Sequence, residues 1–213
     1  MKSTEFVTKL KDIATKYETL YVYGCFGACL KESNKARYTT NSYYEYNKTT
    51  EMIQKVNNAV QKGNVFGFDC VCLLKGVLWG WNGDKSATYG GAVYKSNGVP
   101  DINADSMFKT CTGASSDFSK IEVGEALWTA GHIGVYIGDG LAVECTPSWK
   151  NGVQITAVEN IGKKTGYNSR KWSKHGKLPY IEYVPVDTKT EKIKAKFSEI
   201  EKAQKELYDL IFN

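Results

Sequence analysis

The chain has 213 residues, 42% of them apolar, which is enough for one domain of moderate size with a packed core and excludes global disorder. Its net charge of +5 is diffuse and linked to no known motif, so nucleic-acid binding is not indicated, although an anionic polymer is a compatible partner. No segment approaches the roughly 20 apolar residues of a membrane span, so we expect no stable membrane insertion. Residues 1–11 are charged and amphipathic and contain no secretory core, so we expect synthesis without a signal peptide.

The six cysteines of the chain allow three interpretations. They stand at positions 25, 29, 70, 72, 111 and 145. A disulfide framework is not expected in a chain of this size without a signal peptide. A zinc site needs two closely spaced pairs, and Cys70-x-Cys72 is a poor partner for Cys25-x3-Cys29. We therefore expect no metal or other cofactor, and one reactive thiol among buried ones.

Apolar spacing and capping residues predict the elements of the first third of the chain. They are a helix at 4–18, a short aromatic segment at 21–27, an irregular tyrosine-rich insertion at 31–48 and a helix at about 50–62 that ends at Gly63. Ser3 or Thr4 is expected to cap the first helix, and Thr49 or Thr50 the second.

Residues 66–74 are the first segment of the chain that indicates enzymatic chemistry. We expect a loop that ends at Asp69, which is a good N-cap for a helix running to about Trp79. Cys70 then lies in the first turn, where the helix dipole favours the nucleophilic thiolate. The alternative is that Cys70 is a small buried apolar residue, as free cysteines usually are. Cys72 points to a different face of the helix and is expected to be structural.

The rest of the chain predicts a glycine-rich loop, a short helix and then strands. The expected order is a loop at 80–100, a helix at 101–111 with Asp101 near its start, strands at 126–129, 131–137, 141–145, 153–158 and 179–184, and a helix at 189–211. The segment around His175 is expected to be a loop. These elements indicate an α+β fold.

The strands 131–137 and 141–145 form a predicted hairpin whose register can be derived. A three-residue loop at 138–140 pairs Ile137 with Leu141 and Val135 with Val143, so that one face is apolar. The opposite face then carries His132 diagonally across from Glu144, within reach of long side chains. A Cys nucleophile needs a base and a group that orients the base. We therefore predict a catalytic triad of Cys70, His132 and Glu144.

These residues occur in motifs that resemble the NlpC/P60 family of cell-wall cysteine peptidases, in the papain-like superfamily. Tyr21-Val22-Tyr23-Gly24 is similar to the family's "PYVWGG", Phe68-Asp69-Cys70 to "FDCSG", and the segment 131–140 to "GHVGIYIGNG". The resemblance covers about residues 4–184. The departures are Val71-Cys72 in place of Ser-Gly, Cys25 in place of the second glycine, and about 40 residues inserted before Cys70.

The resemblance implies an antiparallel sheet with the nucleophile-bearing helix packed against it, and hydrolysis of an amide bond in peptidoglycan. Cys70 would be the nucleophile, His132 the base and Glu144 the orienting group, while Tyr21 and Asp69 would assist the oxyanion or the substrate. The context resembles the catalytic module of a phage endolysin, which accumulates in the host cytoplasm and acts on the wall after release. Alternatives are an N-acetylmuramoyl-L-alanine amidase, related to CHAP amidases by its acidic third residue, and a non-catalytic wall-binding or phage tail module.

Two domains are expected. Residues 1–186 form the catalytic domain, with an insertion at about 30–65, and residues 187–213 form a linker or stalk helix. Apolar residues of this helix keep a 4-3 spacing that is broken by Gln204. The helix is expected either to associate with another copy or to lead to a further wall-binding domain, and docking on its own domain is the alternative.

Overall fold

The computed structural model describes residues 1–40, 42–185 and 188–212 and has an α+β fold. It divides into two compact units, Met1–Tyr183 and Val184–Asn213. The helices are α1 (Ser3–Lys16), α2 (Glu32–Thr39), α3 (Thr50–Lys62), α4 (Cys70–Leu78), α5 (Ala104–Lys109) and α6 (Thr188–Phe212), with short 3₁₀ segments at Ser42–Lys48 and Phe118–Lys120. The strands are β1 (Glu18–Tyr21), β2 (Phe26–Cys29), β3 (Val65–Phe68), β4 (Thr112–Ser115), β5 (Ala126–Thr129), β6 (His132–Gly138), β7 (Leu141–Thr146), β8 (Gly152–Val158), β9 (Ser169–Arg170) and β10 (Lys174–Lys177).

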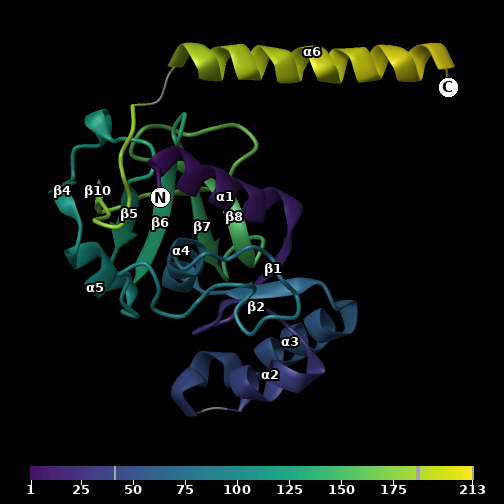
Figure 1. The fold of residues 1–213 in the computed structure, drawn as a ribbon, viewed down its shortest axis with the longest axis vertical. Helices are drawn as coiled ribbons and strands as arrows, with labels where there is room; N and C mark the ends of the chain where they lie inside the picture. The colour runs from purple at the N-terminus through teal and green to yellow at the C-terminus, as the bar shows by residue number, and fades with distance from the viewer. Residues whose placement is uncertain (41, 186–187, 213) are drawn as a thin grey trace. The chain divides into compact units, whose positions relative to one another are not determined.

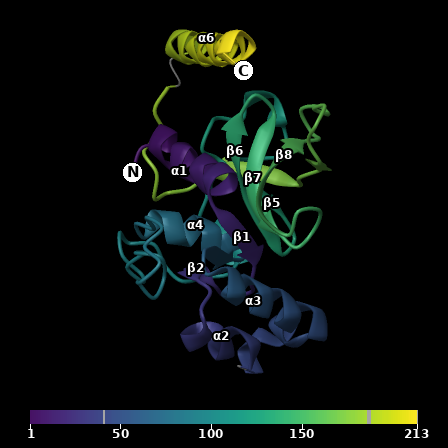
Figure 2. The same ribbon diagram turned by 90° about the vertical axis from the view of Figure 1, so that its right-hand side faces the viewer.

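Two sheets organise the first unit (Figure 1). The larger has the strand order β4-β10-β5-β6-β7-β8-β9 and is antiparallel from β4 to β8, with β9 added in parallel. The smaller has the order β1-β3-β2. Helices α1 and α4 cover one face of the larger sheet, as Figure 2 shows from the side. The sheet therefore holds the start of α4 close to the start of β6.

Helix α4 is buried all round, which agrees with its continuous apolar sequence. Leu73, Leu74 and Val77 are completely inaccessible, and the core around them includes Phe6 and Leu10 of α1. Fully burying one such side chain stabilises the fold by roughly 1.5–3 kcal/mol. A well-packed α4 fixes the position of Cys70, the first residue of that helix.

The predicted caps agree with the structure at two helices and differ at a third. Asp69 caps α4 and Thr49 caps α3, which ends at Gly63 in the left-handed conformation. The N-cap of α1 is Lys2, without a side-chain cap, so the prediction of Ser3 or Thr4 is wrong. The backbone N–H of Ser3 instead donates to the carbonyl of Glu182, so tertiary contact replaces the local cap.

The insertion at 31–48 was expected to be irregular, and the structure shows that it is largely helical. It contains α2 and the 3₁₀ segment Ser42–Lys48. The side chain of Asn34 accepts a hydrogen bond from the Lys31 N–H and donates one to the Cys29 carbonyl, which ties the start of α2 to the end of β2. Tyr38 is the buried anchor of this helix. One buried residue gives too little periodicity to indicate a helix from sequence.

Two strand predictions are also corrected. Residues 65–68 form β3, which lies between β1 and β2, and not the expected loop. Residues 179–184 were expected to be a strand, but the strand is β10, the segment around His175 that was expected to be a loop. Strand β10 pairs with β4 on one side and β5 on the other, and these pairings override its polar sequence.

The β6–β7 hairpin keeps the predicted register but closes differently. Val135 lies opposite Val143, as expected, and this register places Gly134 opposite Glu144. Leu141, however, pairs with Gly138 and not with Ile137, because the register shifts between Tyr136 and Gly138. The turn is the two residues Asp139 and Gly140, both with positive φ, the conformation favoured in tight hairpins. A bulge thus combines a short turn with the register that buries the apolar face.

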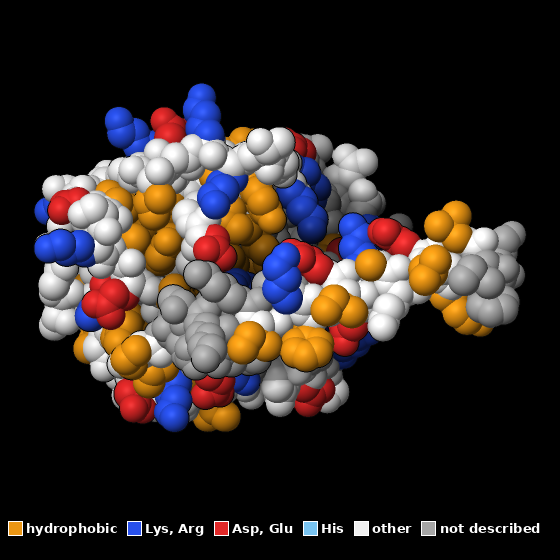
Figure 3. Space-filling model, turned by 90° about the horizontal axis from the view of Figure 1, so that it is seen from above, with side chains coloured by type: hydrophobic (Ala, Val, Ile, Leu, Met, Phe, Trp, Pro, Cys, Tyr) orange, Lys and Arg blue, Asp and Glu red, His pale blue; other side chains and the backbone are white. Residues whose placement is uncertain are grey.

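The second unit is the long helix α6. In the described part of this helix the exposed hydrophobic residues lie among lysines and glutamates (Figure 3). They are Ile193, Phe197, Ile200, Leu207, Tyr208 and Leu210. Ile193, Phe197, Ile200 and Leu207 keep the predicted 4-3 spacing, and self-association through them stays a prediction. Across the described ranges, each helix falls short of the length or the hydropathy that crossing a bilayer requires.

Candidate active site

Asp69 joins the start of α4 to the segment after β1. One carboxylate oxygen accepts the N–H of Cys72 at 2.7 Å, and the other accepts the N–H of Gly24 at 2.8 Å. Asp69 is buried. Because both oxygens are bound by the backbone, the direct contact with substrate that the sequence suggested is not needed to explain this residue. Asp69 holds Cys70 against the Tyr21–Gly24 segment.

The Cys70 thiol lies at the junction of α4 and β6. Cys70 is 6% exposed, and its thiol lies close to the backbone N–H groups of Ile133, Val71 and Cys70 itself. Burial raises the pKa of the thiol to about 12, the charge of Asp69 adds to this increase, and those N–H groups oppose it. Burial therefore favours the thiol form of Cys70, whereas its place in the first helix turn by itself predicts the thiolate.

This raised pKa predicts how Cys70 reacts with iodoacetamide. A group whose pKa lies far above neutrality is a thiol at pH 7, and only its thiolate is nucleophilic. We expect the alkylation rate of Cys70, followed by peptide mass spectrometry, to rise about tenfold per pH unit from pH 6 to 9. The Cys70→Ser protein controls for labelling of other cysteines. A rate that is already constant between pH 6 and 8 would contradict the burial argument.

His132 and Glu144 form the predicted base and orienting pair. Nε2 of His132 lies 2.7 Å from a carboxylate oxygen of Glu144, across the β6–β7 ladder. This contact uses Nε2 and leaves Nδ1 for a different partner. His132 is the first residue of β6, one residue before Ile133, whose backbone N–H lies close to the Cys70 thiol. The structure therefore brings all three predicted triad residues to one region.

Glu144 is fully buried and held as a carboxylate by three groups. Besides its contact with His132, Glu144 accepts hydrogen bonds from Thr156 Oγ1 and from Arg170 Nε, each at 2.7 Å. Burial favours the protonated form, but the bonds from His132, Arg170 and Thr156 outweigh it and lower the pKa of Glu144. A charged Glu144 stabilises the positive charge that His132 acquires when it accepts a proton as the base.

Trp172 fixes the ring of His132 from its face. The two rings are stacked with centroids 5.4 Å apart and planes 11° from parallel. Gly134 makes room for this contact, because a Cβ there would come within 2.9 Å of the indole. The space that Gly134 leaves next to His132 is therefore occupied by Trp172.

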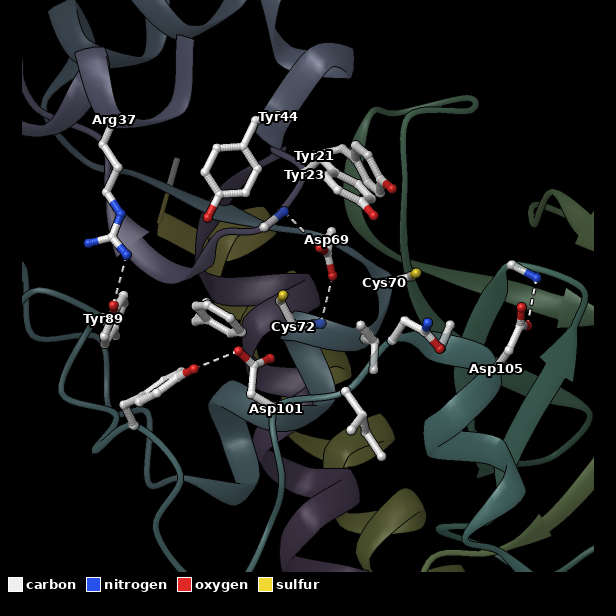
Figure 4. A pocket seen from close by; sticks show the side chains of 18 residues that line it. Tyr21, Tyr23, Arg37, Tyr44, Asp69, Cys70, Cys72, Tyr89, Asp101 and Asp105 are labelled. Carbon is white, nitrogen blue, oxygen red and sulfur yellow. Dashed lines mark hydrogen bonds between the residues drawn. The ribbon is translucent and has the colours of Figure 1, made fainter. Parts of the chain in front are cut away.

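A cleft of about 510 Å³ opens beside Cys70 (Figure 4). Its walls come from the Tyr21–Gly24 segment, the insertion, the 80–100 loop and α5. Tyr21 lies in this cleft, and burial, together with the nearby Cys70 and Asp69, raises the pKa of its phenol. Tyr21 therefore keeps its proton and remains a hydrogen-bond donor, as its predicted role requires.

Asp105 of α5 holds the turn that leads into His132. One of its carboxylate oxygens accepts the N–H of Gly131 and the indole N–H of Trp128, each at 2.8 Å. These two bonds lower the pKa of Asp105. Trp128 in turn stacks on Phe108 with ring planes 15° apart. Asp105 thus couples the position of the β5–β6 turn to α5.

Sequence reasoning missed four of these supporting residues: Asp105, Thr156, Arg170 and Trp172. Thr156 could have been found, because β8 pairs with β7 and places it next to Glu144 on the same face. Arg170 lies on β9, a strand of two residues with no periodic signal. Asp105 and Trp172 reach the site from separate parts of the chain, so no local spacing indicates them.

His175 has a separate, structural environment. It is buried on β10, where Nδ1 contacts Glu125 and Nε2 lies 2.8 Å from the Asp117 carbonyl. Both ring nitrogens therefore have partners, which agrees with a structural residue. Within the described ranges, the His, Cys, Asp and Glu side chains form no group of three or more with the arrangement of a metal site, the cysteines at 25, 29, 70 and 72 included.

Comparison with known protein families finds no family model that matches this chain, and comparison with curated proteins finds no matching sequence.

Proposed function

We propose that this protein is a cysteine peptidase that hydrolyses an amide bond in the stem peptide of peptidoglycan, as an enzyme of NlpC/P60 type. The observation that carries the proposal is the arrangement of Cys70 at the start of α4 and the His132–Glu144 pair at the start of β6, next to an open cleft. The antiparallel sheet with α4 packed against it also agrees with what the resemblance implies.

The chemistry assigns one step to each residue. The thiol of Cys70 attacks the carbonyl carbon of the amide while His132 takes its proton, since a raised thiol pKa requires a base during attack. Backbone N–H groups at the start of α4 and the Tyr21 hydroxyl donate to the oxyanion. His132 then protonates the leaving amine, and water hydrolyses the thioester with His132 as base.

Analysis of digested peptidoglycan by mass spectrometry tests this proposal. An endopeptidase leaves a new amino terminus within the stem peptide. An amidase releases the whole stem peptide from muramic acid, and this alternative is favoured by the carboxylate third residue, Glu144. Binding to the wall without release of soluble fragments would contradict both and indicate the non-catalytic wall-binding or tail module.

The biological setting is part of the proposal. We infer a phage lysin that is made in the host cytoplasm and acts on the cell wall after release. Helix α6 would serve as a stalk that self-associates or leads to a wall-binding domain. The exposed apolar residues Ile193, Phe197, Ile200 and Leu207 support this, because a 4-3 spacing is typical of helices that pack against one another.

Asp105 gives a prediction about positioning. In Asp105→Ala the Gly131 N–H loses its acceptor and the turn before His132 loosens, so kcat should fall about tenfold with little change in KM. Asp105→Asn keeps an oxygen acceptor and should retain most activity. Steady-state kinetics on a soluble stem peptide measure both variants. Equal losses in the two would show that charge, and not the hydrogen bond, is what matters.

A further inference from the structure

Among the residues that the structure describes, four charged ones line the cleft beside Cys70, and three of these are carboxylates with partners in the protein. Asp69 accepts two backbone N–H groups. Asp101 is paired with Lys75 at 2.5 Å and with the Tyr94 hydroxyl at 2.7 Å. Asp105 accepts from Trp128 and Gly131. The fourth, Arg37, is the cation among the lining residues.

Arg37 is held in place without being neutralised. Its Nη2 donates to the Tyr89 hydroxyl at 2.9 Å, and its guanidinium lies over the rings of Tyr89 and Tyr38, 5.4 and 5.9 Å from their centroids. Within the described ranges, it makes no ion pair with a carboxylate. A guanidinium has five N–H donors in a planar fork, so donors remain for a ligand.

The position of Arg37 relative to Cys70 suggests a ligand that spans the cleft. Figure 4 shows Arg37 and Tyr89 on one side of the cleft and Cys70 on the other, with Tyr44 and Asp69 between them. Arg37 comes from α2, in the insertion by which this chain departs from the NlpC/P60 pattern. A peptide whose scissile bond reaches Cys70 would thus place a neighbouring group near Arg37.

We infer that Arg37 forms a carboxylate subsite, so that the cleft selects stem peptides with a free carboxylate over the same peptides with a carboxamide. The identity of the peptide rests on the proposed function, whereas the chemistry of the subsite rests on the Arg37 guanidinium, which has no carboxylate partner among the described residues. A guanidinium binds a carboxylate through two parallel hydrogen bonds, and an amide offers one acceptor and no charge. The carboxylate comes either from the D-glutamyl residue or from the C-terminus of the stem.

Calorimetric binding to the Cys70→Ala protein tests the subsite without hydrolysis. The probes are L-Ala-γ-D-Glu-L-Lys-D-Ala and two relatives, one amidated on the glutamyl α-carboxylate and one on the C-terminus. We expect one of the two amidations to weaken binding by on the order of tenfold. The amidation that does so identifies the source of the carboxylate. Equal Kd values for all three peptides would overturn the inference.

Second-site variants assign the effect to Arg37. Added to Cys70→Ala, Arg37→Gln should weaken binding of the acidic peptide about tenfold and leave the amidated peptide unchanged. Arg37→Lys should recover part of the preference. Lys35→Gln is the matched control, because Lys35 is on the same helix, pairs with Glu32 and does not line the cleft. A preference that survives Arg37→Gln would place the subsite elsewhere.

The inference and the proposed function fail in different ways. If the native protein hydrolyses none of the peptides but Cys70→Ala binds them with the Arg37-dependent preference, the subsite stands and the reaction must be reconsidered. If hydrolysis proceeds at equal kcat/KM on acidic and amidated peptides, the function stands and the subsite is refuted.

Discussion

Replacing Cys70 by alanine should lower peptidoglycan hydrolysis by a factor of about 10⁴ or more, because the covalent intermediate forms on the Cys70 thiol in the proposed reaction. The thiol is small, so its removal should leave the fold intact, with an unchanged circular dichroism spectrum and a melting temperature within a few degrees. Release of soluble fragments from purified walls measures the activity. His132→Ala should cause a comparable loss, since nucleophile and base act together.

Cys72→Ala is the matched control for this prediction. Cys72 lies on the same helix, is 2% exposed, and burial raises the pKa of its thiol well above the usual value. Losing it removes a comparable volume from the same region but leaves Cys70, His132 and Glu144 in place. Activity within a few-fold of the native protein is expected. A Cys70→Ala protein that still lyses walls, or a Cys72→Ala protein that does not, would refute the assignment of the nucleophile.

Local signals in the sequence predicted those parts of the fold that local forces determine. Asp69 and Thr49 identified the starts of α4 and α3, because a side-chain acceptor is what a free helix N-terminus needs. The alternation of β6 and β7 set the register that brings His132 and Glu144 within 2.7 Å of each other. The core of the candidate site could therefore be predicted from sequence.

What could not be predicted depends on contacts between distant segments. Helix α2 is held by Asn34 and by the buried Tyr38, not by a repeating apolar face. Strand β10 is polar in sequence, and it forms because its backbone pairs with β4 on one side and with β5 on the other. The thiol pKa of Cys70 depends on burial that only the assembled core creates, and it reverses the direction expected from the helix dipole.

Replacing Glu144 by alanine should affect stability as well as activity. The variant leaves Arg170 without its carboxylate and Thr156 and His132 without an acceptor in a buried place. Breaking a buried ion pair from one side costs about 3 kcal/mol, which corresponds to a melting temperature lower by on the order of 10 °C for a chain of this length. Lysis should fall to near background, because His132 is no longer held in one orientation. Thermal unfolding and wall lysis are the measurements.

Glu144→Gln separates the charge of this residue from its shape. The amide fills the same space, so the protein should stay folded and partly active, since the third residue orients the base more than it reacts. Because the folded state lowers the pKa of Glu144, the charge stabilises the protein above the ordinary carboxyl pKa, and this stability is lost as the pH falls through the folded pKa. The difference in unfolding free energy between the native and Gln proteins should therefore be largest near pH 7 and shrink in acid.

Thr156→Val, which removes one neutral donor to Glu144, should lower the free energy of unfolding by about 1 kcal/mol and leave lysis nearly intact. A native-like melting temperature in Glu144→Ala would contradict this account, because it would mean that Arg170 and His132 are satisfied without the carboxylate.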